Sequence, residues 1–96
     1  MEIPKTIKIG NLIYNIEEIT DKFEEQDFFG RGWIQEQKIK INPNLKQDFK
    51  NETLFHEIIH LIFDNNGYIE ETRNEKLISL LASGIYQVLK DNDLLK

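Results

Sequence analysis

The chain has 96 residues, with 12 lysines and arginines against 17 aspartates and glutamates, which gives a formal net charge of −5. This length has room for one small domain, residues 1–96. Hydrophobic residues make up 40% and charged residues 30% of the chain, as in folded proteins and unlike disordered ones. The acidic balance argues against a binder of nucleic-acid backbones and against a polybasic membrane-surface domain.

The chain contains no cysteine, which excludes disulfides, thiolate metal sites and cysteine nucleophiles. Residues 1–5 show no basic stretch followed by an apolar core, so we expect no signal peptide. The longest apolar stretch, Leu77 to Leu89, is interrupted by polar residues and falls short of the ~20 residues that a membrane span requires. These features favour a protein of the reducing cytoplasm that has no membrane partner.

The first half of the chain is predicted to form four short strands. Apolar and polar side chains alternate, which is the pattern of a strand with one buried face. Gly10-Asn11 is typical of a hairpin turn, and the acidic stretch Glu17–Gln26 is expected to be a loop or a short helical turn. The predicted strands are Thr6–Ile9, Leu12–Ile16, Arg31–Gln35 and Lys38–Asn42, the last of which is ended by Pro43.

The second half of the chain predicts two helices, beginning with one over Leu45–Asp64. Asn44, followed three residues later by Gln47, has the pattern of a capping box for this helix. A break near Asn51 is an alternative to one continuous helix. The run of polar residues before Gly67 should end the helix, with Gly67 in the left-handed conformation.

A second capping box, Thr72 to Glu75, precedes the other predicted helix, Arg73 to about Lys90. Apolar residues recur along it at helical spacing and predict its core face; they are Leu77, Leu81, Gly84/Ile85 and Val88. Strands followed by helices predict an α+β domain. We expect a small antiparallel sheet of about four strands followed by two packed helices.

The segment His56-Glu57-Ile58-Ile59-His60 matches the pattern H-E-x-x-H and contains both histidines of the chain. On a helix, residues four apart lie one turn apart on one face, so both imidazoles can reach one metal ion. Glu57 is rotated by roughly 100° from His56. It therefore flanks the site, where a general base must lie to take a proton from the attacking water. Two imidazoles and a carboxylate suit zinc, with one position left open.

Two plainer interpretations of the motif stay open: a chance pattern of exposed histidines, and a zinc ion that only stabilises the fold. A third ligand must be an oxygen, because no other histidine and no cysteine is present. The candidates are Glu70, Glu71 and Glu75. We favour Glu75, because the turn after the first helix would fold it back over that helix, and we place Glu71 second. The capping box with Thr72 is the competing role for Glu75.

Three segments together resemble the ImmA/IrrE-like metallopeptidases, and especially their compact phage and prophage members. These segments are the strand Lys38–Asn42, the helix with Thr53 to His60, and Glu75-x-x-Ile78-x-x-Leu81-Ala82-x-Gly84. The resemblance implies a minimal zincin-like domain in which the third zinc ligand is a glutamate on the helix after the motif. That glutamate maps onto Glu75. Larger members often read Glu-x-Glu-Ala-Asn-x-Phe-Ala there, of which this chain keeps the first glutamate and the last alanine.

The resemblance implies a zinc-dependent endopeptidase of the cytoplasm, or of the host cytoplasm for a phage-encoded chain, that acts on a protein or peptide. Tyr68, Tyr86 and Arg73 are the candidates to stabilise the oxyanion. The strand Lys38–Asn42 is the candidate edge for a substrate that adds as an extra strand. A different class of function stays open: a phage accessory or interaction protein that keeps a structural or relic metal site. An adaptor or inhibitor without a metal is the third alternative.

Overall fold

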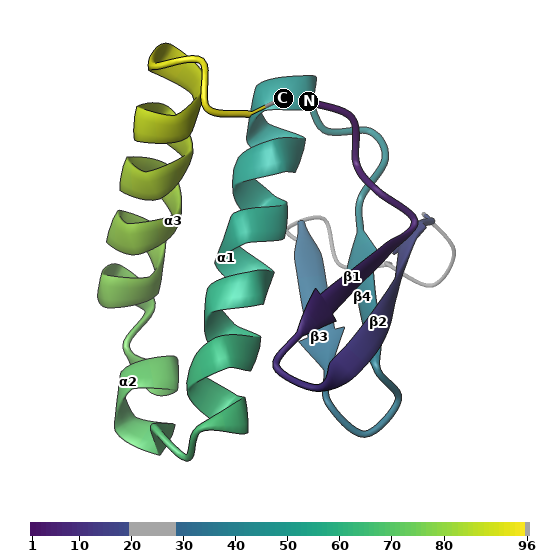
Figure 1. Ribbon diagram of the computed structural model, residues 1–96, viewed down its shortest axis with the longest axis vertical. Coiled ribbons are helices and arrows are strands. Elements are labelled where there is room, and N and C mark those ends of the chain that lie inside the picture. The colour runs from purple at the N-terminus through teal and green to yellow at the C-terminus, as the bar shows by residue number, and fades with distance from the viewer. Residues whose placement is uncertain (20–28, 96) are drawn as a thin grey trace.

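The computed structural model describes residues 1–19 and 29–95, and within these ranges it contains four strands and three helices (Figure 1). The α+β class is therefore confirmed, and a short third helix joins the two long ones that were predicted. Most of the predicted loop, 17–26, lies outside the described residues. The elements are β1 Thr6–Ile9, β2 Leu12–Glu18, β3 Gly30–Trp33, β4 Lys38–Ile41, α1 Gln47–Asn65, α2 Ile69–Arg73 and α3 Glu75–Asp91.

The four strands form one mixed sheet in the order β1-β2-β4-β3. The outer pairs, β1 with β2 and β3 with β4, are antiparallel, but β2 and β4 run parallel. The prediction of a purely antiparallel sheet was wrong at this central pair. Both isoleucines of β4, Ile39 and Ile41, have no exposed surface. These two side chains lie on the same face of β4, which has β2 along one edge and β3 along the other.

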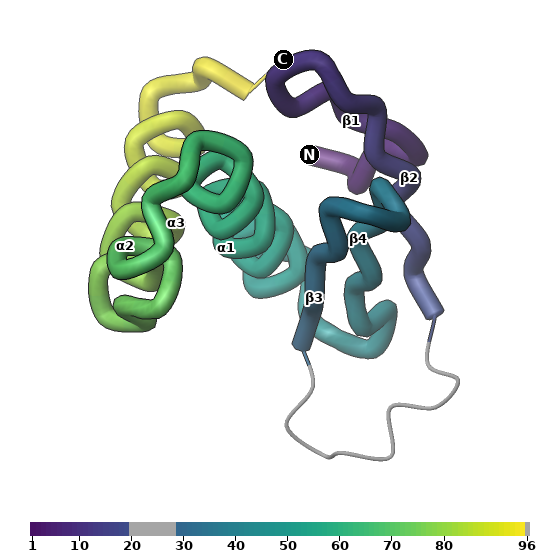
Figure 2. The backbone as a smooth tube through the Cα atoms, turned by 90° about the horizontal axis from the view of Figure 1, so that it is seen from below, coloured from purple at the N-terminus to yellow at the C-terminus, as the bar shows by residue number. Residues whose placement is uncertain are grey.

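Helix α1 is the middle layer of the molecule, between the sheet and the other two helices (Figures 1 and 2). On the sheet side, Leu54 and Leu61 of α1 join a hydrophobic cluster with residues of β1, β2 and β4. On the other side, Ile59 packs with Ile78 and Ala82 of α3 in a second cluster. Because α1 is shared by both clusters, it is held on two opposite faces.

Helix α1 begins at Gln47, two residues later than predicted, and the capping box from Asn44 was wrong. The backbone N–H of Asn44 instead donates to Oδ1 of Asn42 at 2.9 Å, which makes a local turn. The side chain of Gln47 donates to Oδ1 of Asn51 at 2.8 Å. The helix runs unbroken past Asn51, because this buried amide has a partner of its own and donates to the hydroxyl of Tyr86 at 3.0 Å.

The end of α1 is as predicted, with Gly67 in the left-handed region at a φ of 78°. The N–H of Gly67 donates to the carbonyl of Asp64 at 3.2 Å, and the N–H of Tyr68 donates to that of Phe63 at 2.9 Å. These two bonds make a Schellman motif, and the rings of Phe63 and Tyr68 add its usual apolar contact, with centroids 6.1 Å apart. The motif reverses the chain and sends α2 back along α1.

The predicted core face of α3 was partly wrong. Ile78, Ala82 and Tyr86 are the buried residues of this helix, whereas Ile85 and Val88 are 42% and 48% exposed. Apolar residues surround most of α3, and α1 covers it from one side, so spacing alone does not identify the buried face. No helix within the described ranges is both long enough and apolar enough to cross a membrane.

Two glycines give opposite predictions for a change to alanine. A Cβ on Gly30 in β3 would lie 2.7 Å from Cγ2 of Thr53 in α1 and 3.2 Å from the carbonyl of Lys40. We therefore expect Gly30→Ala to lower the free energy of unfolding by about 1–3 kcal/mol through overpacking.

A Cβ on Gly84 meets nothing within 4 Å, so Gly84→Ala should raise the free energy of unfolding by about 0.5–1 kcal/mol. Urea unfolding measures both, and an unaffected Gly30→Ala would contradict the close packing of β3 on α1.

Candidate metal centre

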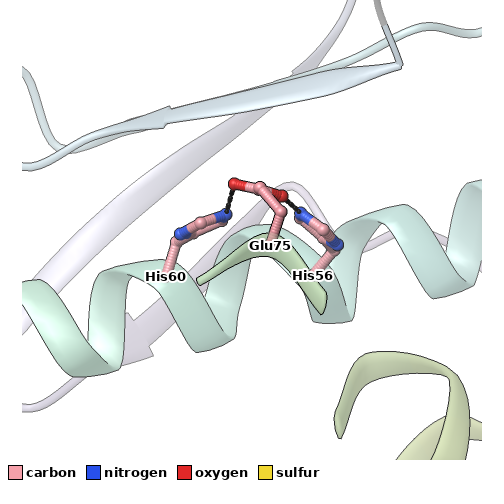
Figure 3. Close-up of side chains that lie close together, drawn as sticks. All are labelled: His56, His60 and Glu75. Atoms are coloured by element: carbon pink, nitrogen blue, oxygen red, sulfur yellow. Dashed lines mark hydrogen bonds and ion pairs between the residues drawn. The ribbon is translucent and has the colours of Figure 1, made fainter. Parts of the chain in front are cut away.

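The two histidines of the motif lie on one face of α1, as the spacing predicts. The ring centroids of His56 and His60 are 4.9 Å apart, with the rings at 61° to each other. Both side chains are half-buried, with exposed fractions of 23% and 18%. Their Nε2 atoms point to the same side, toward the start of α3 (Figure 3).

Glu75 is the first residue of α3, and its carboxylate lies between the two imidazoles (Figure 3). Its Oε2 is 3.1 Å from Nε2 of His56, and its Oε1 is 3.0 Å from Nε2 of His60. The predicted capping box was wrong, because Asn74 is the N-cap and accepts the N–H of Leu77 at 3.1 Å. Capping by Asn74 leaves the Glu75 side chain free to face the histidines.

His56, His60 and Glu75 form the single group of three possible ligand residues found within the described residues, with ligand atoms all within 4.8 Å of one another. Glu70 and Glu71, the other candidates for the third ligand, lie on α2 and are not part of this group. Zinc binds imidazole nitrogen and carboxylate oxygen at about 2.0–2.2 Å. A donor set of two imidazoles and a carboxylate this close together fits such an ion, so the residues suit the metal that the sequence predicts.

The side chain of Glu57 lies on the face of α1 that packs against β3. Its side chain is buried, and its carboxylate accepts a hydrogen bond from the backbone N–H of Gly32. Burial raises the pKa of Glu57 to about 7, and the negative charge of Glu75 adds to this shift. The bond from Gly32 and the charge of Arg31 oppose it. A carboxyl whose pKa lies near neutral pH, on the residue that follows His56, has the property of a general base.

The pKa of His56 is lowered, chiefly by burial and next by the positive charge that His60 can carry. The negative charge of Glu75 and its hydrogen bond to the ring raise the pKa of His56, but by less. The net effect favours the neutral imidazole, which is the form that binds metals.

Sequence reasoning missed two partners of the motif residues. Gly32 supplies the N–H to Glu57, and a Cβ there would lie 3.0 Å from Cδ1 of Leu61, so the backbone of β3 needs a glycine to come this close to α1. Thr72 places its hydroxyl 3.0 Å from Nδ1 of His60. The sequence held one indication of this role. Asn74, directly before Glu75, is as good an N-cap as Thr72, and with Asn74 as the cap the Thr72 hydroxyl is available for another contact.

Of the candidates for oxyanion stabilisation, Tyr86 is engaged elsewhere. Its hydroxyl accepts from Asn51 at 3.0 Å and donates to Oδ1 of Asp48 at 2.8 Å, toward the N-terminal end of α1. Tyr68 packs its ring near that of Phe63 at the opposite end of the helix. Neither contact brings a phenol to the donor set, so the structure does not support Tyr86 in that role.

The candidate edge strand was also wrong, because the residues 38–42 include β4, which lies between β2 and β3. The edge strand nearest to α1 is β3, as Figure 2 shows. The close packing of Gly30 and Gly32 on α1 places the backbone of β3 next to Glu57. Among the strands of the described residues, β3 is therefore the edge strand beside the motif helix, and it is a different strand from the one predicted.

Comparison with protein-family models gives no match for the chain, and the searches of curated proteins and of solved structures likewise give none.

The buried Glu57 predicts how stability depends on pH in the metal-free protein. The folded-state pKa of about 7 lies above the ordinary value of 4.5, so the folded state binds the proton more tightly. Its contribution to stability is complete below the unfolded pKa and is lost as the pH rises through 7. Glu57→Gln cannot ionise, and we expect it to become more stable than the wild type by up to about 3 kcal/mol above pH 7.

Urea unfolding in a chelator, at about pH 4.5 and about pH 8, measures this gap between variant and wild type. Glu36→Gln, an exposed change in the turn after β3, is the control and should show no gap at either pH. A gap for Glu57→Gln that is the same at both values would contradict the buried, proton-binding carboxyl.

Proposed function

We propose that this chain is a minimal zinc-dependent endopeptidase that acts on a protein or peptide in the cytoplasm, as its resemblance to the ImmA/IrrE-like metallopeptidases implies. The observation that carries the proposal is the placement of the Glu75 carboxylate 3.1 and 3.0 Å from the two imidazoles of the motif. Residues of two helices, α1 and α3, thereby bring together two imidazoles and a carboxylate, the donor set that a zinc peptidase uses. Glu57 adds a buried carboxyl on the same helix turn.

His56, His60 and Glu75 would hold the ion. Zinc in such a site supplies Lewis-acid chemistry, making water nucleophilic near neutral pH and polarising the carbonyl of the scissile bond. Glu57 has the role of general base, which takes a proton from water and delivers it to the leaving amine. Its raised pKa of about 7 suits this exchange, because a group that titrates near the working pH can both accept and release a proton.

The outer edge of β3, which pairs with no other strand of the described residues, is the proposed place for the substrate. An extended peptide can add to an open sheet edge through its main-chain hydrogen bonds, with little demand on its sequence. Strand β3 lies at the edge of the sheet nearest to α1, and its Gly32 contacts the Glu57 carboxylate through the backbone N–H. A peptide bound there would run beside the motif helix and bring one of its amide bonds near the donor set.

One observation favours the alternative, an accessory protein with a structural metal site. The bond from Gly32 to the Glu57 carboxylate ties β3 to α1, and such a tie would serve a purely structural role as well. The two functions differ in what they require of Glu57. Catalysis needs a carboxylate, whereas an amide can keep a structural hydrogen bond.

We expect Glu57→Gln to retain zinc and fold while losing peptidase activity by about 10²–10⁴-fold, the usual contribution of a general base. The measurement is the zinc-dependent cleavage rate of a pool of quenched fluorescent peptides of random sequence, with a chelator as the blank. Glu36→Gln is the control of equal charge change, and it should cleave like the wild type because it lies in an exposed turn.

Zinc-loaded wild type that cleaves none of the peptides, or Glu57→Gln that cleaves as fast as the wild type, would overturn the peptidase proposal. Either result, combined with retained zinc, would favour the accessory protein.

A further inference from the structure

Thr72 touches His60 in two places. Its Oγ1 lies 3.0 Å from Nδ1 of the imidazole, and the same hydroxyl donates to the backbone carbonyl of His60 at 3.3 Å. Thr72 belongs to α2, the short helix that the Schellman motif at Gly67 sends back along α1. The contact therefore joins two elements through the side chain of a predicted metal ligand.

The hydrogens of the two contacts depend on the tautomer of His60, and a metal ion bound at Nε2 would select the arrangement in which Nδ1 carries the hydrogen. A threonine hydroxyl has a single hydrogen, and here that hydrogen is donated to the carbonyl of His60. The lone pairs of Oγ1 are then free to accept, and the atom within reach is Nδ1 of His60. A neutral imidazole that carries its hydrogen on Nδ1 presents a lone pair at Nε2. Nε2 is the atom that faces Glu75, at 3.0 Å; without a metal a hydrogen on Nε2 would be donated to this carboxylate, and a metal between the two would take its place.

We propose that Thr72 is the positioning residue that holds His60 in the tautomer and orientation of a metal ligand. This inference rests on the proposed zinc site. Partners of this kind orient ligating histidines in many metal sites, and their loss typically weakens metal binding by about 10–100-fold. Thr72 does not touch the position where the metal would bind, so its effect would act through His60.

The two histidines differ in this respect. Nε2 of His56 also faces Glu75, at 3.1 Å, but within the described residues no hydroxyl contacts its Nδ1 as Thr72 contacts that of His60, and Glu52, one turn earlier on α1, acts on the ring only through its charge. The hydrogen on Nδ1 should therefore be shielded in His60 and open to solvent in His56. This asymmetry can be observed in the wild-type protein without any substitution.

The test compares Thr72→Val, which keeps the shape and removes the hydroxyl, with Thr72→Ser, which keeps the hydroxyl. Zinc affinity is measured by competition with a chromophoric chelator. We expect Thr72→Val to bind zinc about 10–100-fold more weakly and Thr72→Ser to stay within about threefold of the wild type. Thr53→Val, a buried change of the same kind in α1, is the control and should bind zinc as the wild type does.

A second measurement keeps the inference testable if Thr72→Val does not fold. In zinc-loaded wild type, nitrogen-15 NMR of the imidazoles should show a slowly exchanging Nδ1 hydrogen on His60 and a rapidly exchanging one on His56. Equal affinities of the wild type and Thr72→Val, or equal exchange at the two rings, would overturn the role of Thr72 and leave the zinc site intact. Absence of zinc binding by the wild type would instead overturn the proposed function itself.

Discussion

Everything else in this structure depends on the way that α1 is shared between two hydrophobic clusters. Successive residues of a helix are rotated by roughly 100°, so Leu54 and Leu61 face the sheet while Ile59 faces α3. Between these two apolar faces run two seams along the sides of the helix. The two seams differ in how their polar side chains are held. The first, the closed seam, holds α1 to α3 through the hydrogen bonds of Tyr86 with Asn51 and Asp48, and the second, the open seam, carries the histidines of the motif.

The closed seam is built on Asn51, which is fully buried and donates to the hydroxyl of Tyr86, which in turn donates to Asp48. A buried hydrogen bond whose groups are all satisfied, such as that between Asn51 and Tyr86, fixes the position of one helix against another. In the open seam, His56 and His60 are half-buried and the side chain of Glu75 is 66% exposed. The fixed seam thus sets the distance between α1 and α3, while the open one leaves the donor atoms within reach of a ligand from solvent.

Much of this arrangement could be predicted from local patterns, because local patterns determine local structure. The alternation in Lys38–Ile41, the stop at Gly67 and the shared face of His56 and His60 all follow from spacing over a few residues. Strand order could not be predicted in the same way, since several orders bury one face of four short strands equally well. The parallel pairing of β2 with β4 joins Asn15 to Lys38, 23 positions further along the chain, so no local pattern indicates it.

The candidate site shows the same division between local and tertiary information. Glu75 was favoured as the third ligand, and its carboxylate lies between the two imidazoles, but the residue that caps α3 in its place was missed. Thr72 and Asn74 are both acceptable caps by residue type, and only the path of the chain after α1 decides between them. Along that path, Asn74 becomes the N-cap of α3 and the Thr72 hydroxyl contacts His60. The contact of Gly32 with Glu57 likewise depends on how closely β3 packs on α1, which no periodicity encodes.

The central claim is that His56, His60 and Glu75 hold one zinc ion, and zinc titration of the metal-free protein tests it most directly. We predict binding of about one zinc ion per chain for the wild type and for Glu71→Ala, with binding by Glu75→Ala at least about tenfold weaker. Circular dichroism of each variant confirms that it is folded. A wild type that binds no zinc, or a Glu75→Ala variant that binds it as tightly as the wild type, would contradict the claim.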